Sequence, residues 1–504
     1  MVPTSSPAST TAELSDELSR VTTLPSADGT RPGALVEEAR RLFALQRAHR
    51  WTVAARPAEA RVAGLVRLRT AIVAHREDLY EAMWADFRKP HAEVELTEIQ
   101  PTLLELDHAR RHLARWMRPR RARTPLVLAG TRSELRYEPR GVVLIMAPWN
   151  YPVGLLLTPL VAAVAAGNCA ILRPSEKVPR TADVLARIVR AAFEEREVAC
   201  LSEPGVELAE ALVRLPFDHV FFTGSTAVGR RVMDGAAEHL ATVTLELGGK
   251  SPLVVDDGAD VERAAERAVW GKFINAGQTC LAPDYAVVHE RVAPEFVAAA
   301  MRTIVRFYGD SEESRQRSPH LARAIDDAAF RRLSGLLARS VAAGARIEIG
   351  GRLDAGERYV APTLLTNVDW DSPAMAEEIF GPILPVLTCA SLADLPDRIN
   401  RLGKPLALYV FSRRRDDVEQ LLRRTSSGGA VVNNVAIHYA NPNVPFGGVG
   451  ESGQGSYHGW YGFRTFSHER SVLVQGWPSL GHVIYPPYDE RMDRALAAVR
   501  RWLS

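Results

Sequence analysis

The sequence predicts an α/β fold made of two parallel-sheet domains, and three observations support this prediction. The chain has 504 residues, which is too long for one ordinary domain. Short, wholly apolar runs alternate with helical segments, as buried parallel strands alternate with their crossover helices. Hydrophobic residues make up 46% and charged residues 24% of the chain, so it can bury a large core.

The N-terminal part precedes this alternation. Residues 1–32 are rich in Ser, Thr, Pro and Ala, and we expect a disordered tail there. Charged residues at helical spacing predict helices from Ala34 to Trp116. Leu126–Leu128 and Leu135–Tyr137 then predict the two short strands of a hairpin around Gly130.

Two successive alternations predict two sheets. In the first, the expected strands are Gly141–Ile145, Cys169–Leu172, His219–Phe222, Val243–Leu245 and Leu253–Val255, and the expected helices are Ala182–Phe193, Val206–Leu212 and Ala227–His239. In the second, between Ala259 and Thr425, the expected strands are Tyr285–Val288, Ile347–Ile349, Leu384–Leu387 and Ala407–Phe411.

The uncharged stretch Val153–Leu172 is long enough to span a bilayer. Gly154, Pro159 and Gly167 interrupt it, so we expect a buried helix (Leu155–Ala166) followed by a buried strand (Cys169–Leu172), and no integral membrane segment. The first residues lack the basic and apolar regions of a secretory signal. We therefore expect a cytoplasmic protein.

Charge and cysteine content narrow the function further. The net charge is +2, which gives no reason to expect nucleic acid as a partner. The four cysteines form no CxxC pair, and no His spacing indicates zinc, so we expect no metal site. So few cysteines do not make a disulfide framework, which agrees with a reducing compartment.

The segment Phe221–Gly229 places a glycine and a hydroxyl residue between an expected strand and helix. Gly224, Ser225 and Gly229 would let free N–H groups and the positive helix end face a phosphate. An ordinary helix cap explains the same residues when they are taken alone.

The segment Arg173-Pro174-Ser175-Glu176 follows another buried strand, where ligands bind in α/β sheets. The Glu176 carboxylate can accept both hydroxyls of a ribose and would repel a 2′-phosphate. A solvated turn is an equally good interpretation of this segment by itself.

Two residues suit nucleophilic chemistry. Glu246 ends an apolar strand before Leu247 and two glycines, where desolvation would raise its pKa and suit a general base. Cys280 follows a polar, glycine-containing loop and is a candidate reactive thiolate. Alone, Glu246 is equally a carboxylate bonded to neighbouring amides, and a lone cysteine is usually an inert core residue.

Together these segments resemble one family. From about Gly33 to Val474 the chain resembles the aldehyde dehydrogenases, whose fold joins a Rossmann-type cofactor domain, an α/β catalytic domain and a β-hairpin oligomerisation arm. The C-terminal segments Ser452–Gly459 and Thr465–His468 are similar to the class 3, fatty-aldehyde and coniferyl-aldehyde branch. The matching motifs are Pro148–Pro152, Phe222–Ser225, Glu246–Lys250, Gly277–Cys280, Glu377–Pro382 and Pro445–Gly448.

The resemblance implies a mechanism without metal. Cys280 would attack the aldehyde, and the Asn150 amide with the Cys280 backbone N–H would hold the oxyanion. Hydride transfer to NAD(P) would leave a thioester on Cys280. Glu246 would then activate water and release the carboxylic acid.

It also implies the cofactor contacts. Glu378 would hold the nicotinamide ribose beside Phe380, and Trp149 would pack near the cofactor. Arg173 departs from the family, which often has Lys there, and its bidentate fork leaves NADP open beside NAD. The full expected set is Trp149, Arg173, Ser175, Glu176, Gly224, Ser225, Gly229, Leu247, Glu378 and Phe380.

The resemblance further implies a homodimer, because the hairpin and the strand Ser471–Gln475 match the arm that pairs edge strands between subunits. The expected parts are a tail (1–32), a cofactor domain (33–123 and 141–246), a catalytic domain (247–450), the arm (124–140 and 451–475) and a C-terminal extension (476–504). In that extension Met492, Leu496, Val499 and Leu503 share one helix face, which favours packing on a partner subunit over a membrane surface.

Three alternatives remain at this point. A CoA-acylating relative would not need Glu246, and a retired enzyme serving as a structural protein would be expected to lose Cys280 or Glu246. A lipid-surface scaffold would act through the C-terminal helix. The branch implies medium- or long-chain aliphatic or aromatic aldehydes as substrates.

Overall fold

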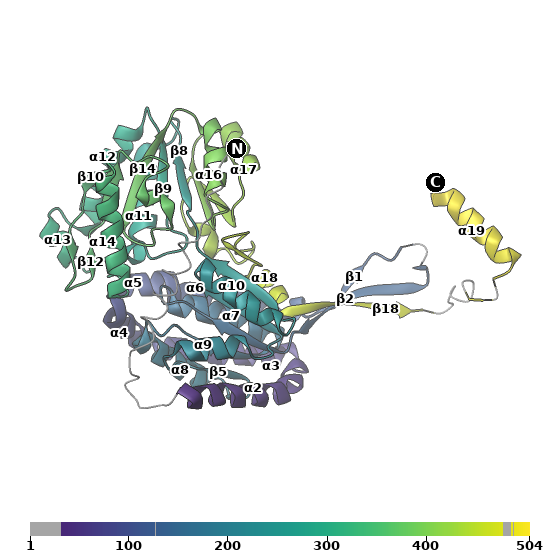
Figure 1. The fold of residues 1–504 in the computed structure, drawn as a ribbon. Coiled ribbons are helices and arrows are strands. Elements are labelled where there is room, and N and C mark those ends of the chain that lie inside the picture. Colours follow the sequence, from purple (N-terminus) through teal and green to yellow (C-terminus); the bar gives the residue numbers. More distant parts are fainter. Residues whose placement is uncertain (1–31, 126–127, 477–484, 487, 504) are drawn as a thin grey trace, which may run out of the picture.

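The computed structural model describes residues 32–125, 128–476, 485–486 and 488–503. Two α/β bodies pack together, and a long β arm leaves them on one side (Figure 1). The expected N-terminal tail lies almost wholly outside the described residues. The predicted fold class is confirmed, because each body is built on a largely parallel sheet covered by helices.

The N-terminal part is helical, as predicted. Its elements, in order, are α2 (Pro32–Ala54), α3 (Ala58–Ala74), α4 (Arg76–Phe87), α5 (His91–Val94), the π-helical turn η1 (Glu95–Ile99) and α6 (Gln100–Trp116). Helices α3 and α6 bury apolar faces against α7 (Pro152–Ala166) and α8 (Pro179–Ala192) in the largest core cluster. A π turn inside a helix is rare and is frequent at functional sites.

The first sheet has the strand order β17-β7-β6-β3-β4-β5. All pairs are parallel except β17 with β7. The strands are β3 (Val142–Met146), β4 (Cys169–Arg173), β5 (Val198–Cys200), β6 (His219–Gly224), β7 (Thr242–Leu247) and β17 (Gly453–Gln454), with α9 (Val206–Val213) and α10 (Thr226–Ala237) among the crossover helices. The expected strands and helices of this sheet agree with these bounds within a few residues, except for Leu253–Val255.

The uncharged stretch after β3 is a helix and a strand, as predicted. Every residue of α7 is buried, and β4 is buried along its length. Among the described residues, no helix has the length and apolar character needed to cross a membrane.

The second sheet has the order β10-β13-β14-β9-β8-β15-β16. Sequence analysis placed Leu253–Val255 with the first sheet, and this is wrong: β8 (Pro252–Val255) pairs with β9 and β15. Its apolar run fits either sheet, and only the tertiary pairing decides. The other strands are β9 (Tyr285–His289), β10 (Arg346–Ile349), β13 (Thr363–Thr366), β14 (Ile383–Cys389), β15 (Ala407–Phe411) and β16 (Gly429–Val432).

Helices and short elements surround the second sheet. They are α11 (Val261–Phe273), η3 (Ile274–Gly277), α12 (Ala293–Tyr308), α13 (Glu312–Arg317), α14 (Asp327–Ala342), α15 (Pro373–Ala376), η4 (Leu392–Asp394), α16 (Leu395–Arg401), α17 (Arg415–Arg424) and η5 (Ile437–Ala440). Strands β11 (Leu353–Asp354) and β12 (Tyr359–Val360) form a small separate ribbon, and α18 (Gly459–Thr465) leads toward the arm.

The arm is a three-stranded antiparallel sheet in the order β1-β2-β18, drawn extending away from the two bodies in Figure 1. Its strands are β1 (Arg120–Ala122), β2 (Thr131–Pro139) and β18 (Ser467–Gln475). The predicted strand at Leu126–Leu128 is wrong where it can be judged, since Leu128 lies in a turn; residues 126–127 lie outside the described part. The strand that pairs with β2 is β1, which is charged and exposed and therefore has no apolar pattern.

The expected C-terminal helix is present as α19 (Glu490–Leu503), which Figure 1 draws beyond the arm. Leu496 is exposed. The side chains of Val499 and Leu503, which complete the expected apolar face, lie outside the described residues.

Candidate active site

The candidate site gathers at the carboxyl edge of the first sheet. Strand β3 lies between β4 and β6, so the chain leaves β3 toward β4 on one side and returns to β6 on the other. Such a switch point leaves a crevice in which α/β proteins bind ligands. Strands β3, β4, β6 and β7 and the loops that follow them carry the candidate residues of the first body, while Cys280, Glu378 and Phe380 come from the second body.

Asn150 follows β3 and is 3% exposed. Its side-chain Nδ2 donates to the backbone carbonyl of Gln278 at 3.0 Å. The amide has two N–H donors. One is therefore fixed against the loop that precedes Cys280.

Glu246 lies near the end of β7 and is 1% exposed. Neither of its carboxylate oxygens has a hydrogen-bond partner of good geometry among the described residues, and the same holds for the nearby Thr223 hydroxyl. Burial raises the pKa of Glu246 to about 7, while the Cys280 thiol and the Thr223 hydroxyl act in the opposite direction. A buried carboxyl group without partners, close to a thiol, is suited to take and release protons near neutral pH.

Cys280 lies on a loop with unusual backbone conformation. Asn275, Ala276 and Gly277 have φ values of 53°, 53° and 72°, a left-handed run between α11 and the cysteine. At Gly277 a Cβ atom would lie 2.2 Å from the carbonyl oxygen of Gly381, so only glycine fits. Backbone strain of this kind is concentrated at functional sites.

The Cys280 thiol is held in its neutral form by its surroundings. Burial raises its pKa well above the ordinary value, and the nearby Glu246 and Glu378 carboxylates raise it further. Cys169, Cys200 and Cys389 also have raised pKa values from burial, and none of the four cysteines is in a disulfide. Cys280 is therefore distinguished by its contact with Glu246, through which it can lose its proton.

Glu378 and Phe380 come from the segment before β14. Burial raises the pKa of Glu378 to about 8, and the nearby Asp284 carboxylate adds to this effect. Its carboxyl group occupies the space above Gly248, where a Cβ would lie 2.1 Å from a carboxylate oxygen. Phe380 meets Trp149 edge to face at 5.5 Å, so these residues are brought to the loop that carries Asn150.

The β6–α10 turn is closed by a helix cap. Ser225 is the N-cap of α10, and its hydroxyl accepts from the Val228 N–H at 3.4 Å. Gly224 ends β6. At Gly229 a Cβ would lie 2.9 Å from the Leu247 side chain, so this glycine lets α10 pack closely on β7.

Arg173 lies differently from its sequence-based interpretation. Its guanidinium is buried and donates to the backbone carbonyls of Leu201, Glu203 and Gly205 at 3.1, 2.7 and 3.2 Å. These three bonds direct the Arg173 guanidinium into the protein. The guanidinium also forms an ion pair with Glu176 at 3.8 Å. Ser175 accepts from the Lys177 N–H, and the Glu176 side chain is 43% exposed.

Sequence analysis missed the residues behind Asn150. The carbonyl of Asn150 accepts from Lys89 and Asn275, and neither was a candidate. Glu93 and Glu98 of the N-terminal helices also reach this region, where they accept from the backbone N–H groups of Asn275 and Val153, and both lie more than 50 positions before Asn150 in the sequence. In the described part of the chain, no group of three or more His, Cys, Asp or Glu side chains could hold a metal ion.

Comparisons with known proteins agree with this arrangement. The model of the aldehyde dehydrogenase family matches residues 16–472. The chain is 44% identical to 4,4′-diaponeurosporen-aldehyde dehydrogenase of Staphylococcus aureus over 84% of this chain and 91% of that protein. It is 42% identical to aldehyde dehydrogenase family 3 member B1 of Homo sapiens over 88% and 93% of the two chains.

A solved structure of Staphylococcus aureus AldH in a substrate-bound state superposes with a TM-score of 0.87 and 41% identity, covering 91% of this chain and 99% of that one. An indole-3-acetaldehyde dehydrogenase complexed with NAD+ superposes with a TM-score of 0.79 and 26% identity, covering 87% and 89%. The chain thus shares fold and sequence with dehydrogenases over most of its length.

The fold and site define an oxidoreductase with a partly buried cysteine and a neighbouring buried carboxyl group at the switch point of the first sheet. This chain belongs to the aldehyde dehydrogenase family. It is an NAD(P)-dependent enzyme that oxidises aldehydes, and the retired-protein alternative is not favoured.

Proposed function

We propose that Cys280 is the nucleophile, that Asn150 holds the oxyanion and that Glu246 is the general base of this dehydrogenase. One observation supports this assignment above the others. The Glu246 carboxyl group is buried and has no hydrogen-bond partner of good geometry in the described part of the chain, its pKa is about 7, and it lies close enough to Cys280 to affect the pKa of the thiol.

In the first half-reaction, the Cys280 thiol gives its proton to the Glu246 carboxylate, and its sulfur forms a bond to the aldehyde carbon. The carbonyl π electrons move onto the oxygen, where the second N–H of Asn150 and the backbone N–H of Cys280 stabilise the charge. When the oxyanion collapses, the former aldehyde C–H bond breaks with loss of hydride, and a thioester remains on Cys280.

Glu246 first releases the proton that it took from Cys280 to solvent. In the second half-reaction, the Glu246 carboxylate removes a proton from a water molecule that attacks the thioester carbon. The bond between carbon and sulfur breaks, Glu246 returns that proton to the Cys280 sulfur, and the carboxylic acid leaves. A CoA-acylating enzyme would use a thiol acceptor here. The buried carboxyl group favours hydrolysis, because water is a much weaker acid than a thiol and depends more on a general base to attack.

The residues at the crevice suit a nicotinamide dinucleotide, which accepts the hydride when bound. The N-terminus of α10 offers backbone N–H groups for a pyrophosphate, and the Glu176 carboxylate can accept ribose hydroxyls. Trp149, Glu378 and Phe380 would hold the nicotinamide end of the cofactor. Leu247 and Gly229 would form the surface beneath it, where α10 packs on β7. The Arg173 guanidinium donates to backbone carbonyls and is therefore not available to hold the 2′-phosphate of NADP. We therefore assign NAD as the preferred cofactor.

We infer medium- or long-chain aliphatic or aromatic aldehydes as substrates. The similar proteins that support this are the diaponeurosporen-aldehyde dehydrogenase and the indole-3-acetaldehyde dehydrogenase named above. A panel of aldehydes of increasing chain length, assayed with NAD and NADP by absorbance of the reduced cofactor, tests this class. Highest kcat/KM with short aldehydes such as acetaldehyde would contradict it.

We also propose that the protein is a homodimer whose subunits pair through the β arm. We further propose a cytoplasmic location and the domain boundaries given above. Leu473 on β18 is 55% exposed, and β18 is the edge of the arm sheet, so it can pair with a second copy. Light scattering of the purified protein should give twice the chain mass, and Leu473→Glu should lower it. A monomeric wild-type protein would contradict the dimer.

The catalytic assignment is tested by Cys280→Ala with Cys389→Ala as the matched control. The first variant should lose aldehyde oxidation by at least about a thousandfold, because no nucleophile remains. The second should keep it. Full activity of Cys280→Ala would overturn the proposal.

A further inference from the structure

A fully buried ion pair lies behind the candidate oxyanion site. Lys89 follows α4, and Glu98 lies in the π-helical turn η1. Their side chains are 0% exposed, and Lys89 Nζ is 2.6 Å from Glu98 Oε1. Removing two charges from water is costly, and a buried ion pair is weak evidence for stability. Its position therefore needs a reason other than stability.

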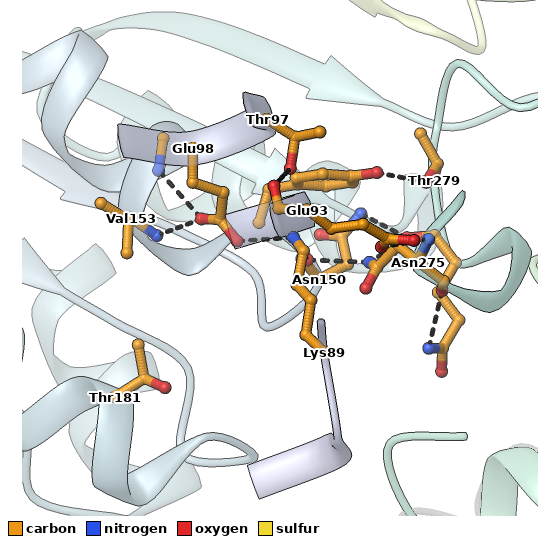
Figure 2. Close-up of polar contacts among 12 residues, drawn as sticks. Lys89, Glu93, Thr97, Glu98, Asn150, Val153, Thr181, Asn275 and Thr279 are labelled. Atoms are coloured by element: carbon orange, nitrogen blue, oxygen red, sulfur yellow. Dashed lines mark hydrogen bonds and ion pairs between the residues drawn. The ribbon is translucent and has the colours of Figure 1, made fainter. Parts of the chain in front are cut away.

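The contacts of this pair supply that reason, as Figure 2 shows. Lys89 Nζ also donates to the backbone carbonyl of Asn150 at 3.3 Å. The other oxygen of Glu98 accepts from the Val153 and Gly154 N–H groups at 2.8 and 3.2 Å. The ion pair thus holds both ends of the short turn between Asn150 and helix α7.

A second set of contacts joins the same turn to the Cys280 loop. Asn275 Nδ2 donates to the Asn150 carbonyl at 2.9 Å and to the Gln278 carbonyl at 3.1 Å. Lys89 Nζ lies 3.8 Å from the centre of the Tyr151 ring. The Tyr151 hydroxyl is 2.7 Å from the hydroxyl of Thr279, the residue before Cys280.

We propose that Lys89, held by Glu98, is a positioning residue for the Asn150 amide. Lys89 bonds to the backbone of Asn150, while the side chain of Asn150 bonds to Gln278 and faces the nucleophile. Fixing the backbone fixes the direction of the side-chain amide before substrate arrives. This inference rests on the proposed role of Asn150.

Preorganised donors carry much of the stabilisation of an oxyanion, and a small misplacement of such a donor is costly. Lys89 is fully buried, and its contacts described above are with Glu98, the Asn150 carbonyl and the Tyr151 ring, so we assign its effect on the reaction to the placement of Asn150. A purely structural role predicts a different result. It would lower the stability of the fold without a specific dependence on the Asn150 side chain.

The test uses the double variant Lys89→Met/Glu98→Gln in the full-length enzyme. Methionine removes the donor, and glutamine removes the charge that would otherwise lie buried without a partner while its carbonyl still accepts from α7. Stopped-flow measurement of the first-turnover burst of reduced cofactor reports acylation and hydride transfer. We expect the burst rate constant to fall about 10- to 100-fold, with the Kd for NAD unchanged.

The same pair of substitutions is then made in an Asn150→Ala background. If Lys89 acts through Asn150, it has no further effect there, and the burst rates of the two Asn150→Ala proteins agree within about twofold. An equal slowing in both backgrounds would overturn the proposal, as would a wild-type burst in the double variant. If Asn150→Ala alone had a wild-type burst, the proposed role of Asn150 would fail instead.

Two further variants keep the test informative. Arg56→Met/Glu197→Gln neutralises a partly buried pair beside β5, the edge strand of the first sheet, and should leave the burst unchanged. If the first double variant does not fold, Lys89→Gln/Glu98→Gln replaces it, because this variant keeps neutral polar groups at both positions. The glutamine at position 89 is shorter than lysine and should not reach the Asn150 carbonyl. The burst of this variant should slow in the same Asn150-dependent way, and an Asn150-independent effect would overturn the proposal.

Discussion

The side-chain amide of Asn150 donates to the carbonyl oxygen of Gln278 at 3.0 Å, which ties the turn after β3 to the loop that carries Cys280. The two residues come from different parts of the fold, 128 positions apart. The bond sets the direction of the second amide N–H. The proposed nucleophile and its proposed oxyanion donor are therefore placed as one unit.

Removing this donor should slow the chemistry and not the binding of cofactor. Asn150→Ala is expected to lower kcat/KM for aldehydes about 100- to 1000-fold, the usual cost of one oxyanion donor. Isothermal titration with NAD gives the matched control and should show an unchanged Kd. An unchanged kcat/KM would mean that other groups hold the oxyanion.

The hydrolysis step should depend on pH through Glu246. Its pKa is about 7 in the folded protein, and only the deprotonated carboxylate can act as base. The rate of thioester hydrolysis should therefore rise about tenfold from pH 6 to pH 8 and then level off. Single-turnover release of the acid measures this rate. If the hydrolysis rate of Glu246→Gln still rose with pH in the same way, another group would be the base, such as Glu378, whose pKa is about 8.

Cofactor preference should depend on Glu176 more than on Arg173. Glu176→Gln removes the negative charge that would repel a 2′-phosphate, and the KM for NADP should fall about tenfold relative to that for NAD. Arg173→Lys should leave that ratio nearly unchanged, because Arg173 donates to backbone carbonyls. A large loss of NADP use in Arg173→Lys would instead place the guanidinium on the phosphate.

The strained loop before Cys280 should tolerate no side chain at Gly277. In Gly277→Ala the new Cβ would meet the Gly381 carbonyl at 2.2 Å in a left-handed conformation, so the loop must move. We expect at least about a hundredfold loss of kcat. The free energy of unfolding, measured with urea, should fall by about 2 kcal/mol. Gly258→Ala is the control, since its Cβ would make only an ordinary 3.6 Å contact. Equal behaviour of both variants would contradict a constrained loop.

The sequence was sufficient to predict the two α/β bodies because their buried strands are continuous apolar runs. Local patterns also located Glu246 at a strand end and Cys280 on a loop. They could not assign β8 to a sheet, because an apolar strand suits either one. They also misplaced one strand of the arm, since the exposed β1 has no apolar signal and its pairing depends on β2.

Local sequence patterns could not predict the hydrogen-bond network behind Asn150, for a different reason. Lys89 and Glu98 are ordinary residues of a helical block in the sequence. Their role depends on the π turn in η1 and on contacts with residues more than 50 positions away. Arg173 shows the same limit, because its partners Leu201, Glu203 and Gly205 belong to the next crossover.

The central claim is that Cys280 and Glu246 divide the reaction into acylation and hydrolysis. Stopped-flow measurement of Glu246→Gln, mixed with NAD and excess aldehyde, tests it most directly. We expect a first turnover of about one reduced cofactor per active site, formed more slowly than in the wild type because Cys280 has lost its proton acceptor. Steady turnover should then be slowed at least about a hundredfold, with an acyl group on Cys280 in the intact mass. Steady turnover at the wild-type rate, or a slow phase with no acyl group on Cys280, would contradict the account.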